Sequence, residues 1–184
     1  MKARTARLRR QTKETDVEIV LTLDGTGIGK VECEDQFLRH MMETLTKYAS
    51  FDLELKAVGD DRHHLIEDVG IVLGLALRQA IGDKPIERVA SATVPMDDAV
   101  VTAAIDMIGR PYVDIDCPDD LCLHFFRSFA MSAGITLHIM VERGFDEHHI
   151  IEAGFKALGM SLRKATIPRA ALLSTKGKPK TRRK

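Results

Sequence analysis

The pattern His-His-x-x-Glu occurs twice in this chain, at residues 63–67 and again at 148–152. Each half also has one earlier histidine on the preceding predicted helix, His40 in the first half and His124 in the second. The similarity continues in the residues that follow, where Leu73-Gly74 and Leu77-Arg78 align with Leu158-Gly159 and Leu162-Arg163. We interpret this as an internal duplication of one βα unit, so the chain is expected to fold as two similar halves.

The first half has the apolar alternation of a β-hairpin followed by amphipathic helices. Strands are predicted over 17–23 and 31–33, joined by the turn Asp24-Gly25-Thr26-Gly27. The other elements predicted here are a helix over 37–48, a strand over 51–57 and a helix over 63–81. A linker at 82–85 separates this half from the next.

The second half repeats this alternation of strands and helices. Its predicted elements are strands near 90–95, 99–106, 111–116 and 135–141, and helices over about 124–133 and 148–165. The predicted class is therefore α+β, with two β-rich layers and helices on one face, duplicated. We expect one half over 1–84, the second over 85–177, and a basic disordered tail over 178–184.

The composition excludes several classes of protein. No apolar run approaches the roughly 18 residues that a membrane helix requires. The first ten residues hold five basic side chains and no apolar segment, which argues against a secretory signal. The three cysteines, Cys33, Cys117 and Cys122, include no Cys-x-x-Cys pair and favour a reducing compartment. We therefore expect a cytoplasmic protein that does not bind membranes.

The balance of 27 basic and 27 acidic residues hides an uneven distribution. Residues 1–10 and 176–184 hold eleven of the Lys and Arg residues and no acid, so the body of the chain is acidic. Because binding to nucleic-acid phosphates needs clustered Lys and Arg, we expect no nucleic-acid partner. An acidic body is compatible with cation binding.

Six of the seven histidines belong to the duplicated pattern, and only His138 lies outside it. A lone histidine is usually structural, but repeated histidines with a carboxylate at helical spacing favour a metal site. The candidate ligands are His40, His63, His64, Glu67, His124, His148, His149 and Glu152. Adjacent histidines on a helix point about 100° apart, so each pair is expected to serve two different ions. Imidazole and carboxylate without thiolate suit Mn²⁺, Fe²⁺ or Zn²⁺, either in a catalytic site or in a closed structural one.

The order of motifs along the chain resembles the imidazoleglycerol-phosphate dehydratase family from about Arg10 to Gly177. The matching segments are Arg10-Gln-Thr-Lys-Glu-Thr15, Phe37-Leu-Arg-His-Met41, His63-His-Leu-Ile-Glu-Asp68, Pro95-Met-Asp-Asp-Ala99, Gly109-Arg-Pro111, His124-Phe-Phe126, Ala133-Gly-Ile-Thr-Leu-His138, His148-His-Ile-Ile-Glu-Ala153, Phe155-Lys-Ala-Leu158 and Ser174-Thr-Lys-Gly177. The family usually has Asp before the His-Met pair, where this chain has Arg39, and it tends to have longer loops before Phe37 and before the first double histidine.

This resemblance implies tandem ferredoxin-like halves, similar to the second domain of ribosomal protein S5, and a shell of 24 subunits whose contacts complete the sites. It also implies a hydro-lyase of histidine biosynthesis that converts imidazole glycerol phosphate to imidazole acetol phosphate. Two divalent ions per site, expected to be manganese, would be bridged by the substrate ring as an imidazolate. The ring would then act as the electron sink for loss of a proton and of hydroxide.

The resemblance further assigns roles outside the histidine pattern. Glu14 is expected to be the catalytic carboxylate that transfers the proton. The small phosphorylated substrate is expected to be bound by Arg88, Arg110, Ser174 and Lys176. Asp97 and Asp98 are expected to support the ligands or contact the substrate.

Three other classes of function fit parts of the pattern. A dinuclear metal hydrolase would use the same ligands, and a metal-storage cage would need no phosphate-binding arginines. Nucleic-acid binding through the basic termini is a third alternative, although such tails are usually solvated chain ends.

Overall fold

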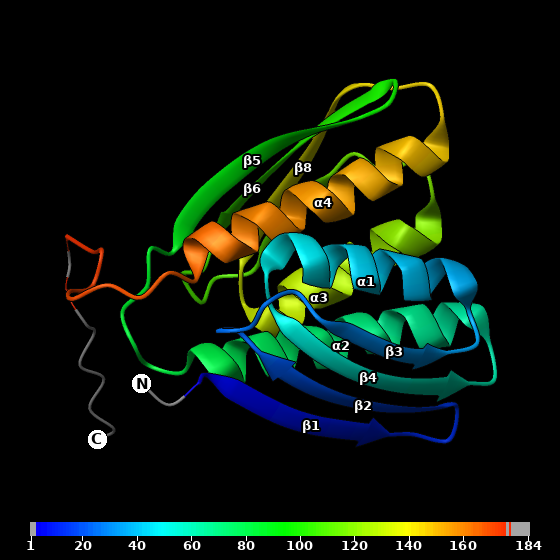
Figure 1. The fold of residues 1–184 in the computed structure, drawn as a ribbon, viewed down its shortest axis with the longest axis horizontal. Coiled ribbons are helices and arrows are strands. Elements are labelled where there is room, and N and C mark those ends of the chain that lie inside the picture. The colour runs from blue at the N-terminus through cyan, green and yellow to red at the C-terminus, as the bar shows by residue number, and fades with distance from the viewer. Residues whose placement is uncertain (1–2, 176, 178–184) are drawn as a thin grey trace.

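The computed structural model describes residues 3–175 and 177. Lys176 and the predicted tail over 178–184 lie outside the described residues. The described residues form the elements β1 (Thr5–Gln11), β2 (Thr15–Thr22), β3 (Gly29–Cys33), α1 (Gln36–Ala49), β4 (Asp52–Gly59), α2 (Arg62–Ile81), β5 (Val89–Met96), β6 (Ala99–Asp106), β7 (Tyr112–Ile115), α3 (Asp120–Ala133), β8 (Thr136–Arg143) and α4 (Glu147–Ala165). The order β-β-β-α-β-α therefore occurs twice (Figure 1).

Both halves build the same four-stranded sheet. Its strand order is β1-β2-β4-β3 in the first half and β5-β6-β8-β7 in the second. In each sheet the first three strands of this order are antiparallel, and the last strand pairs in parallel with its neighbour. The α+β class and the internal duplication are thus confirmed.

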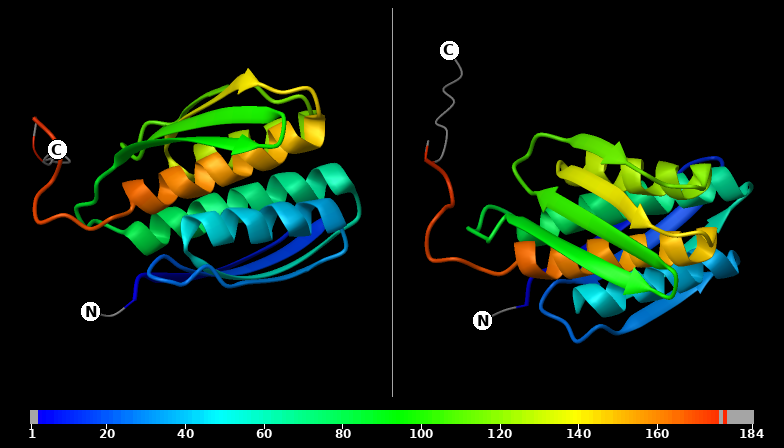
Figure 2. Two further views of the ribbon diagram at one scale, coloured as in Figure 1. Left: turned by 45° about the horizontal axis from the view of Figure 1, so that its top comes forward. Right: turned by 90° about the horizontal axis from the view of Figure 1, so that it is seen from above.

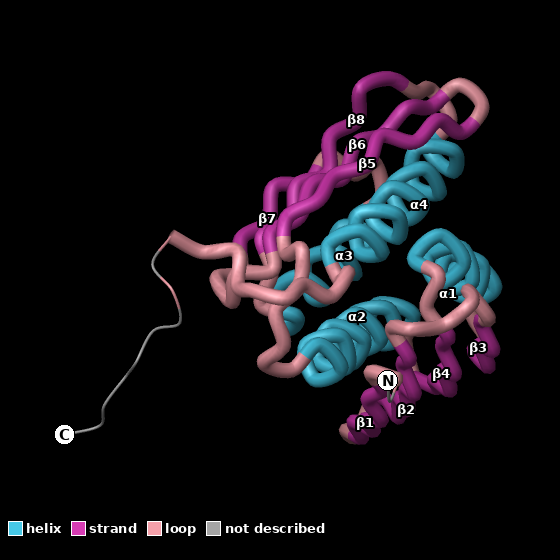
Figure 3. The backbone as a smooth tube through the Cα atoms, turned by 60° about the vertical axis from the view of Figure 1, so that its left-hand side comes forward, coloured by secondary structure: helices cyan, strands magenta, loops and turns pink. Residues whose placement is uncertain are grey.

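The helices lie between the two sheets, so that each sheet is covered on one face only (Figures 2 and 3). Strand alternation explains this arrangement, because Val17, Ile19 and Leu21 of β2 point to one face and are buried. The second half repeats it with Val101, Ala103 and Ile105 of β6. Within the described residues, no helix has the length and apolar character needed to cross a membrane.

The predicted hairpin between residues 17–23 and 31–33 is wrong. The partner of β2 across a tight turn is β1, which the sequence analysis missed, and β3 instead lies parallel to β4 at the other edge of the sheet. The segment between β2 and β3 crosses the end of β4, where the Asp52 carboxylate accepts hydrogen bonds from Thr26 N at 2.8 Å and Ile28 N at 3.0 Å. The strand β1 is hard to recognise because its solvent face carries arginines and its inner face ends in the half-buried Arg10.

Helix α3 begins at Asp120, four residues before the predicted start. Its cap explains the difference, because the Asp119 side chain accepts a hydrogen bond from Cys122 N at 2.8 Å. His124 therefore lies in the second turn of the helix rather than at its beginning.

Glycines allow helices of the two halves to approach closely. A Cβ atom on Gly74 of α2 would lie 2.8 Å from Ala133 N of α3 and would also overlap the carbonyl oxygen of Phe129. A Cβ atom on Gly159 of α4 would lie 2.8 Å from the carbonyl oxygen of Leu45 in α1. These two glycines are equivalent in the duplication, so a glycine allows the helix backbones to approach closely at both contacts between the halves.

We predict that Gly74→Ala destabilises the protein by about 1–3 kcal/mol, because the added methyl group has no space between two helix backbones. Gly154→Ala is the matched control, since its Cβ would meet nothing closer than Phe126 Cζ at 3.7 Å. The control should be neutral or stabilising by up to about 1 kcal/mol. Urea denaturation without added metal measures both changes, and equal stability of the two variants would contradict this account of the helix contact.

Candidate metal centre and substrate pocket

All four helices begin at the same end of the helix layer (Figure 1). The histidines of the duplicated pattern fall within the first two turns of these helices. Each helix starts after an aspartate whose side chain accepts a backbone N–H hydrogen bond, as N-cap residues do. These caps are Asp35, Asp61, Asp119 and Asp146. The caps fix where each helix begins and therefore which way its first side chains point.

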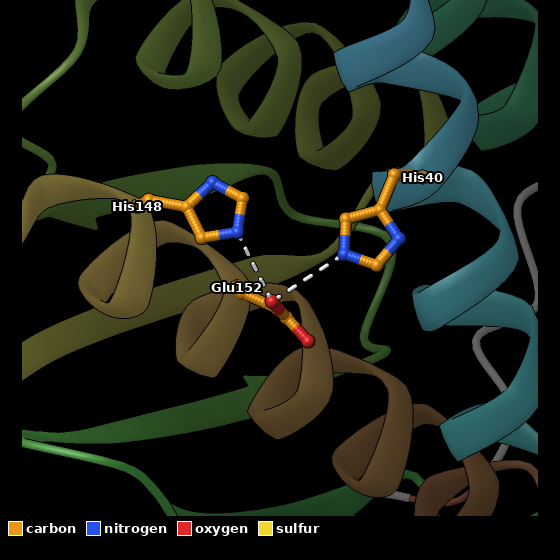
Figure 4. A group of neighbouring side chains, drawn as sticks. All are labelled: His40, His148 and Glu152. Carbon is orange, nitrogen blue, oxygen red and sulfur yellow. Dashed lines mark ion pairs between the residues drawn. The ribbon is translucent and has the colours of Figure 1, made fainter.

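Three of the candidate ligands meet between α1 and α4. Glu152 Oε2 lies 3.4 Å from His40 Nε2 and 3.3 Å from His148 Nε2 (Figure 4). The two imidazole rings are parallel within 7°, and one donor atom from each of the three side chains lies within 4.8 Å of the others. The structure therefore brings a possible metal-binding group together from the two halves.

Lys156 holds the carboxylate of this group. Its Nζ lies 2.9 Å from Glu152 Oε1, which leaves Oε2 directed toward the histidines. Burial alone would raise the pKa of Glu152, but hydrogen bonds from Lys156 and His40 outweigh it and keep the pKa below its ordinary value. The carboxylate is therefore ionised at neutral pH, as a metal ligand must be.

The duplication produces a looser counterpart between α2 of the first half and α3 of the second. The ring centroids of His63 and His124 are 4.7 Å apart, and His63 Nε2 lies 3.9 Å from Glu67 Oε2. As in the first group, one helix supplies a His–Glu pair at i, i+4 and a helix of the other half supplies the remaining histidine.

His64 and His149 belong to neither group. The rings of adjacent histidines are nearly perpendicular, at 85° for His63 and His64 and 75° for His148 and His149. His64 Nδ1 lies 3.0 Å from Asp60 Oδ1 and 4.0 Å from Glu14 Oε2. The hydrogen bond with Asp60 raises the pKa of His64.

His149 has the corresponding place in the second half. Its Nδ1 lies 2.6 Å from Asp98 Oδ1, and its Nε2 lies 3.4 Å from Asp97 Oδ2. The hydrogen bond with Asp98 raises the pKa of His149 and, together with backbone hydrogen bonds from Phe145 and Asp146, strongly lowers the pKa of Asp98.

The described residues that were predicted to bind phosphate lie together in a different place. Arg88, Arg110 and Ser174 line one pocket, which also contains Lys84, while Lys176 is not described. Arg88 is held there by an ion pair with Asp106, with 2.7 Å between Nε and Oδ1, and by donation to the carbonyl oxygen of Leu173 at 2.9 Å.

This pocket lies at the opposite end of the helix layer from the histidines. Arg88 N donates to the carbonyl oxygen of Ala165, the last residue of α4, whereas His148 lies in the first turn of the same helix. At a rise of 1.5 Å per residue, these two ends of α4 are about 25 Å apart. One chain therefore does not bring its histidine groups and its cationic pocket together.

Several functional neighbours were missed from the sequence. The sequence pattern indicates no role for Asp60 or Lys156. In the structure Asp60 contacts His64, and Lys156 forms an ion pair with Glu152. Asp60 lies four residues before His64, a helical spacing that was a usable signal. Arg39 donates to the carbonyl oxygen of Cys33 at 2.6 Å and so ties α1 to β3.

The fold is a duplicated α+β architecture, and it contains an imidazole–carboxylate group, His40, His148 and Glu152, that could hold a metal ion. A family profile described as imidazoleglycerol-phosphate dehydratase matches residues 33–162. Proteins with that same name from Gluconobacter oxydans and Alkaliphilus metalliredigens are 49% and 46% identical to this chain. The first alignment covers 95% of this chain and 98% of the relative, and the second covers 91% and 95%.

Solved structures agree with this similarity. The Pyrococcus furiosus enzyme, described as IGPD in complex with (S)-C348, superimposes with a TM-score of 0.84 at 38% identity, over 92% of this chain and 99% of that one. Imidazoleglycerol-phosphate dehydratase from Staphylococcus aureus gives a TM-score of 0.81 at 31% identity, over 90% and 99%. The chain belongs to the imidazoleglycerol-phosphate dehydratase family, and its activity is that of a hydro-lyase of histidine biosynthesis.

We predict that His148→Ala weakens Mn²⁺ binding by at least about tenfold, because it removes a candidate ligand of the ion. Loss of a residue that only orients a ligand already costs roughly that much. His138→Ala is the control, since His138 lies on β8 beside Asp114 and outside both groups. Mn²⁺ titration followed by electron paramagnetic resonance measures the binding. Equal weakening in the two variants would show that the effect is not specific to the group of His40, His148 and Glu152.

Proposed function

We propose that this chain removes water from imidazole glycerol phosphate in the cytoplasm, and that it uses two divalent metal ions per site, which are Mn²⁺. The observation that carries the proposal is the group of His40, His148 and Glu152, repeated by His63, His124 and Glu67.

The donor set fits two such ions. Each group offers two imidazoles and a carboxylate, which suit Mn²⁺, Fe²⁺ or Zn²⁺ and leave room for further ligands. We propose that His64 and His149, which lie outside both groups in their own chain, each supply a fourth ligand to a site of another copy. When bound, the ions would supply Lewis acidity and hold the substrate ring in a fixed orientation.

Glu14 is the proposed proton carrier. It lies in the turn between β1 and β2, its side chain is 57% exposed, and its carboxylate is 4.0 Å from His64 Nδ1. In this role it takes the proton from the middle carbon of the chain, which is next to the carbon that bears the imidazole. The hydroxyl group on the imidazole-bearing carbon leaves with a proton as water, and the resulting enol becomes the ketone by gaining a proton on that same carbon.

Arg88, Arg110, Ser174 and Lys176 are the proposed phosphate ligands. A guanidinium group presents a planar fork of donors that matches phosphate oxygens. The ion pair with Asp106 orients the Arg88 side chain in the pocket and leaves Arg110 as a second cation there. The two cationic side chains in this pocket support binding of the substrate's phosphate, away from the carbons that react.

The position of the two ends supports the assembly of several copies. A substrate made of a ring, a three-carbon chain and a phosphate spans about 10 Å, from bond lengths near 1.5 Å. It is too short to join the histidines and the cationic pocket of one chain. We therefore propose that each site takes these parts from different copies within a shell of 24 subunits. The 88% exposure of Phe145, three residues before His148, supports a contact surface at this end.

We predict that the Mn²⁺-loaded protein converts imidazole glycerol phosphate to the ketone, and that Glu14→Gln lowers kcat by about 10²–10⁴ because the proton carrier is lost. Glu18→Gln is the matched control on β2, where Glu18 contacts only Arg7 at 3.8 Å among the ion pairs of the described residues. Formation of the ketone is followed by absorbance. A wild-type protein without this activity would refute the function, and a Glu14→Gln variant with wild-type kcat would remove Glu14 from the mechanism.

A further inference from the structure

The duplication places two turn carboxylates at equivalent positions. In the first half Gln11 pairs with Asp16, and the turn between β1 and β2 carries Glu14 directly before the first residue of β2. In the second half Met96 pairs with Ala99, and Asp98 stands directly before the first residue of β6. Each carboxylate lies beside the second histidine of its half, Glu14 beside His64 and Asp98 beside His149.

The contacts of the two carboxylates differ. Asp98 Oδ1 is 2.6 Å from His149 Nδ1, and its Oδ2 accepts hydrogen bonds from Phe145 N at 2.6 Å and Asp146 N at 3.1 Å. Glu14 Oε2 is 4.0 Å from His64 Nδ1, which is beyond hydrogen-bond distance. Asp98 is therefore held by its neighbours, whereas the Glu14 carboxylate does not hydrogen-bond to the adjacent histidine.

The reason for this difference lies four residues before each histidine. In the segment Gly59-Asp60-Asp61, Asp60 accepts or shares the proton of His64 Nδ1 at 3.0 Å. The equivalent segment is Gly144-Phe145-Asp146, in which Phe145 has no polar side chain. In the second half the carboxylate beside the histidine therefore comes from Asp98, in the neighbouring turn, and not from position 145.

We propose that Asp98 is a positioning residue that fixes His149 with Nδ1–H donated to its carboxylate and Nε2 presented to a metal ion. The same carboxylate anchors the backbone of the turn whose Asp146 caps α4, so it fixes both the ring and the start of the helix. A hydrogen bond from the second ring nitrogen to a carboxylate is the usual way in which a ligating histidine is oriented. The exposed Asp97 carboxylate, 3.4 Å from Nε2, adds negative charge where a cation would bind.

This inference rests on the proposed metal site and extends it, because it assigns different roles to the two equivalent carboxylates. Asp60 already orients His64, so the Glu14 carboxylate is not needed for that role and remains available for proton transfer. Asp98 is not available in this way, because its carboxylate already accepts three hydrogen bonds. Loss of Asp98 should therefore affect metal binding, and loss of Glu14 should affect turnover.

The test compares Asp98→Asn with Glu14→Gln in the full chain, using Mn²⁺ titration by calorimetry and steady-state kinetics with imidazole glycerol phosphate. We expect Asp98→Asn to weaken Mn²⁺ binding by about 10–100-fold, with kcat largely restored at saturating Mn²⁺. Glu14→Gln should bind Mn²⁺ as the wild type does and lose kcat. Wild-type Mn²⁺ affinity in Asp98→Asn, or equal weakening in both variants, would overturn the proposal.

A second change tests whether Asp98 acts through the histidine or only through the backbone turn. Adding Phe145→Asp to Asp98→Asn recreates the Gly-Asp-Asp segment of the first half and should restore Mn²⁺ affinity. If the double variant binds no more tightly than Asp98→Asn, the role of Asp98 is structural and the proposal fails. A wild type that binds Mn²⁺ but forms no ketone would refute the proposed function alone, because the titrations would still report on Asp98.

Discussion

The candidate site depends on how closely helices of the two halves approach one another. His40 lies on α1 of the first half, but its partners His148 and Glu152 lie on α4 of the second. The same exchange joins His124 of α3 to His63 of α2. Neither half alone holds a complete group, so the contact between backbones at Gly74 and Gly159 is a condition of the chemistry as well as of the fold.

Much of the fold was predictable because its signals are local. Helix periodicity and the aspartate caps place the histidines at helix starts, and repetition of the pattern indicates two equivalent halves. Strand pairing was not predictable in the same way. The turn residues after β2 are typical of a hairpin, yet Asp52 on a distant strand binds that segment and leads the chain to the far edge of the sheet.

The site was predictable in its residue types but not in its grouping. Spacing along one helix pairs Glu152 equally well with either of its preceding histidines, and only the approach of α1 selects His148. The separation of the histidines from Arg88 and Arg110 is likewise a property of helix length and packing. The order of motifs along the chain does not indicate that the histidines and the arginines lie at opposite ends of the folded molecule.

The two halves have diverged at equivalent positions around their shared pattern. Lys156 holds Glu152, whereas the residue four positions after Glu67 is Ile71, which offers no charge. Phe145 stands where the first half has Asp60. The two candidate groups therefore have different electrostatic surroundings, although their residue types and helix positions correspond.

We propose that one active site combines the histidine end of one copy with the cationic pocket of another. Co-expression of Glu14→Gln with Arg110→Ala tests this most directly. Each variant alone is expected to be inactive, but the Glu14→Gln variant keeps an intact cationic pocket and the Arg110→Ala variant keeps an intact histidine end. Random mixing should restore about one site in four, since each site draws on two subunits. Activity no greater than the sum of the two separate variants would contradict the claim.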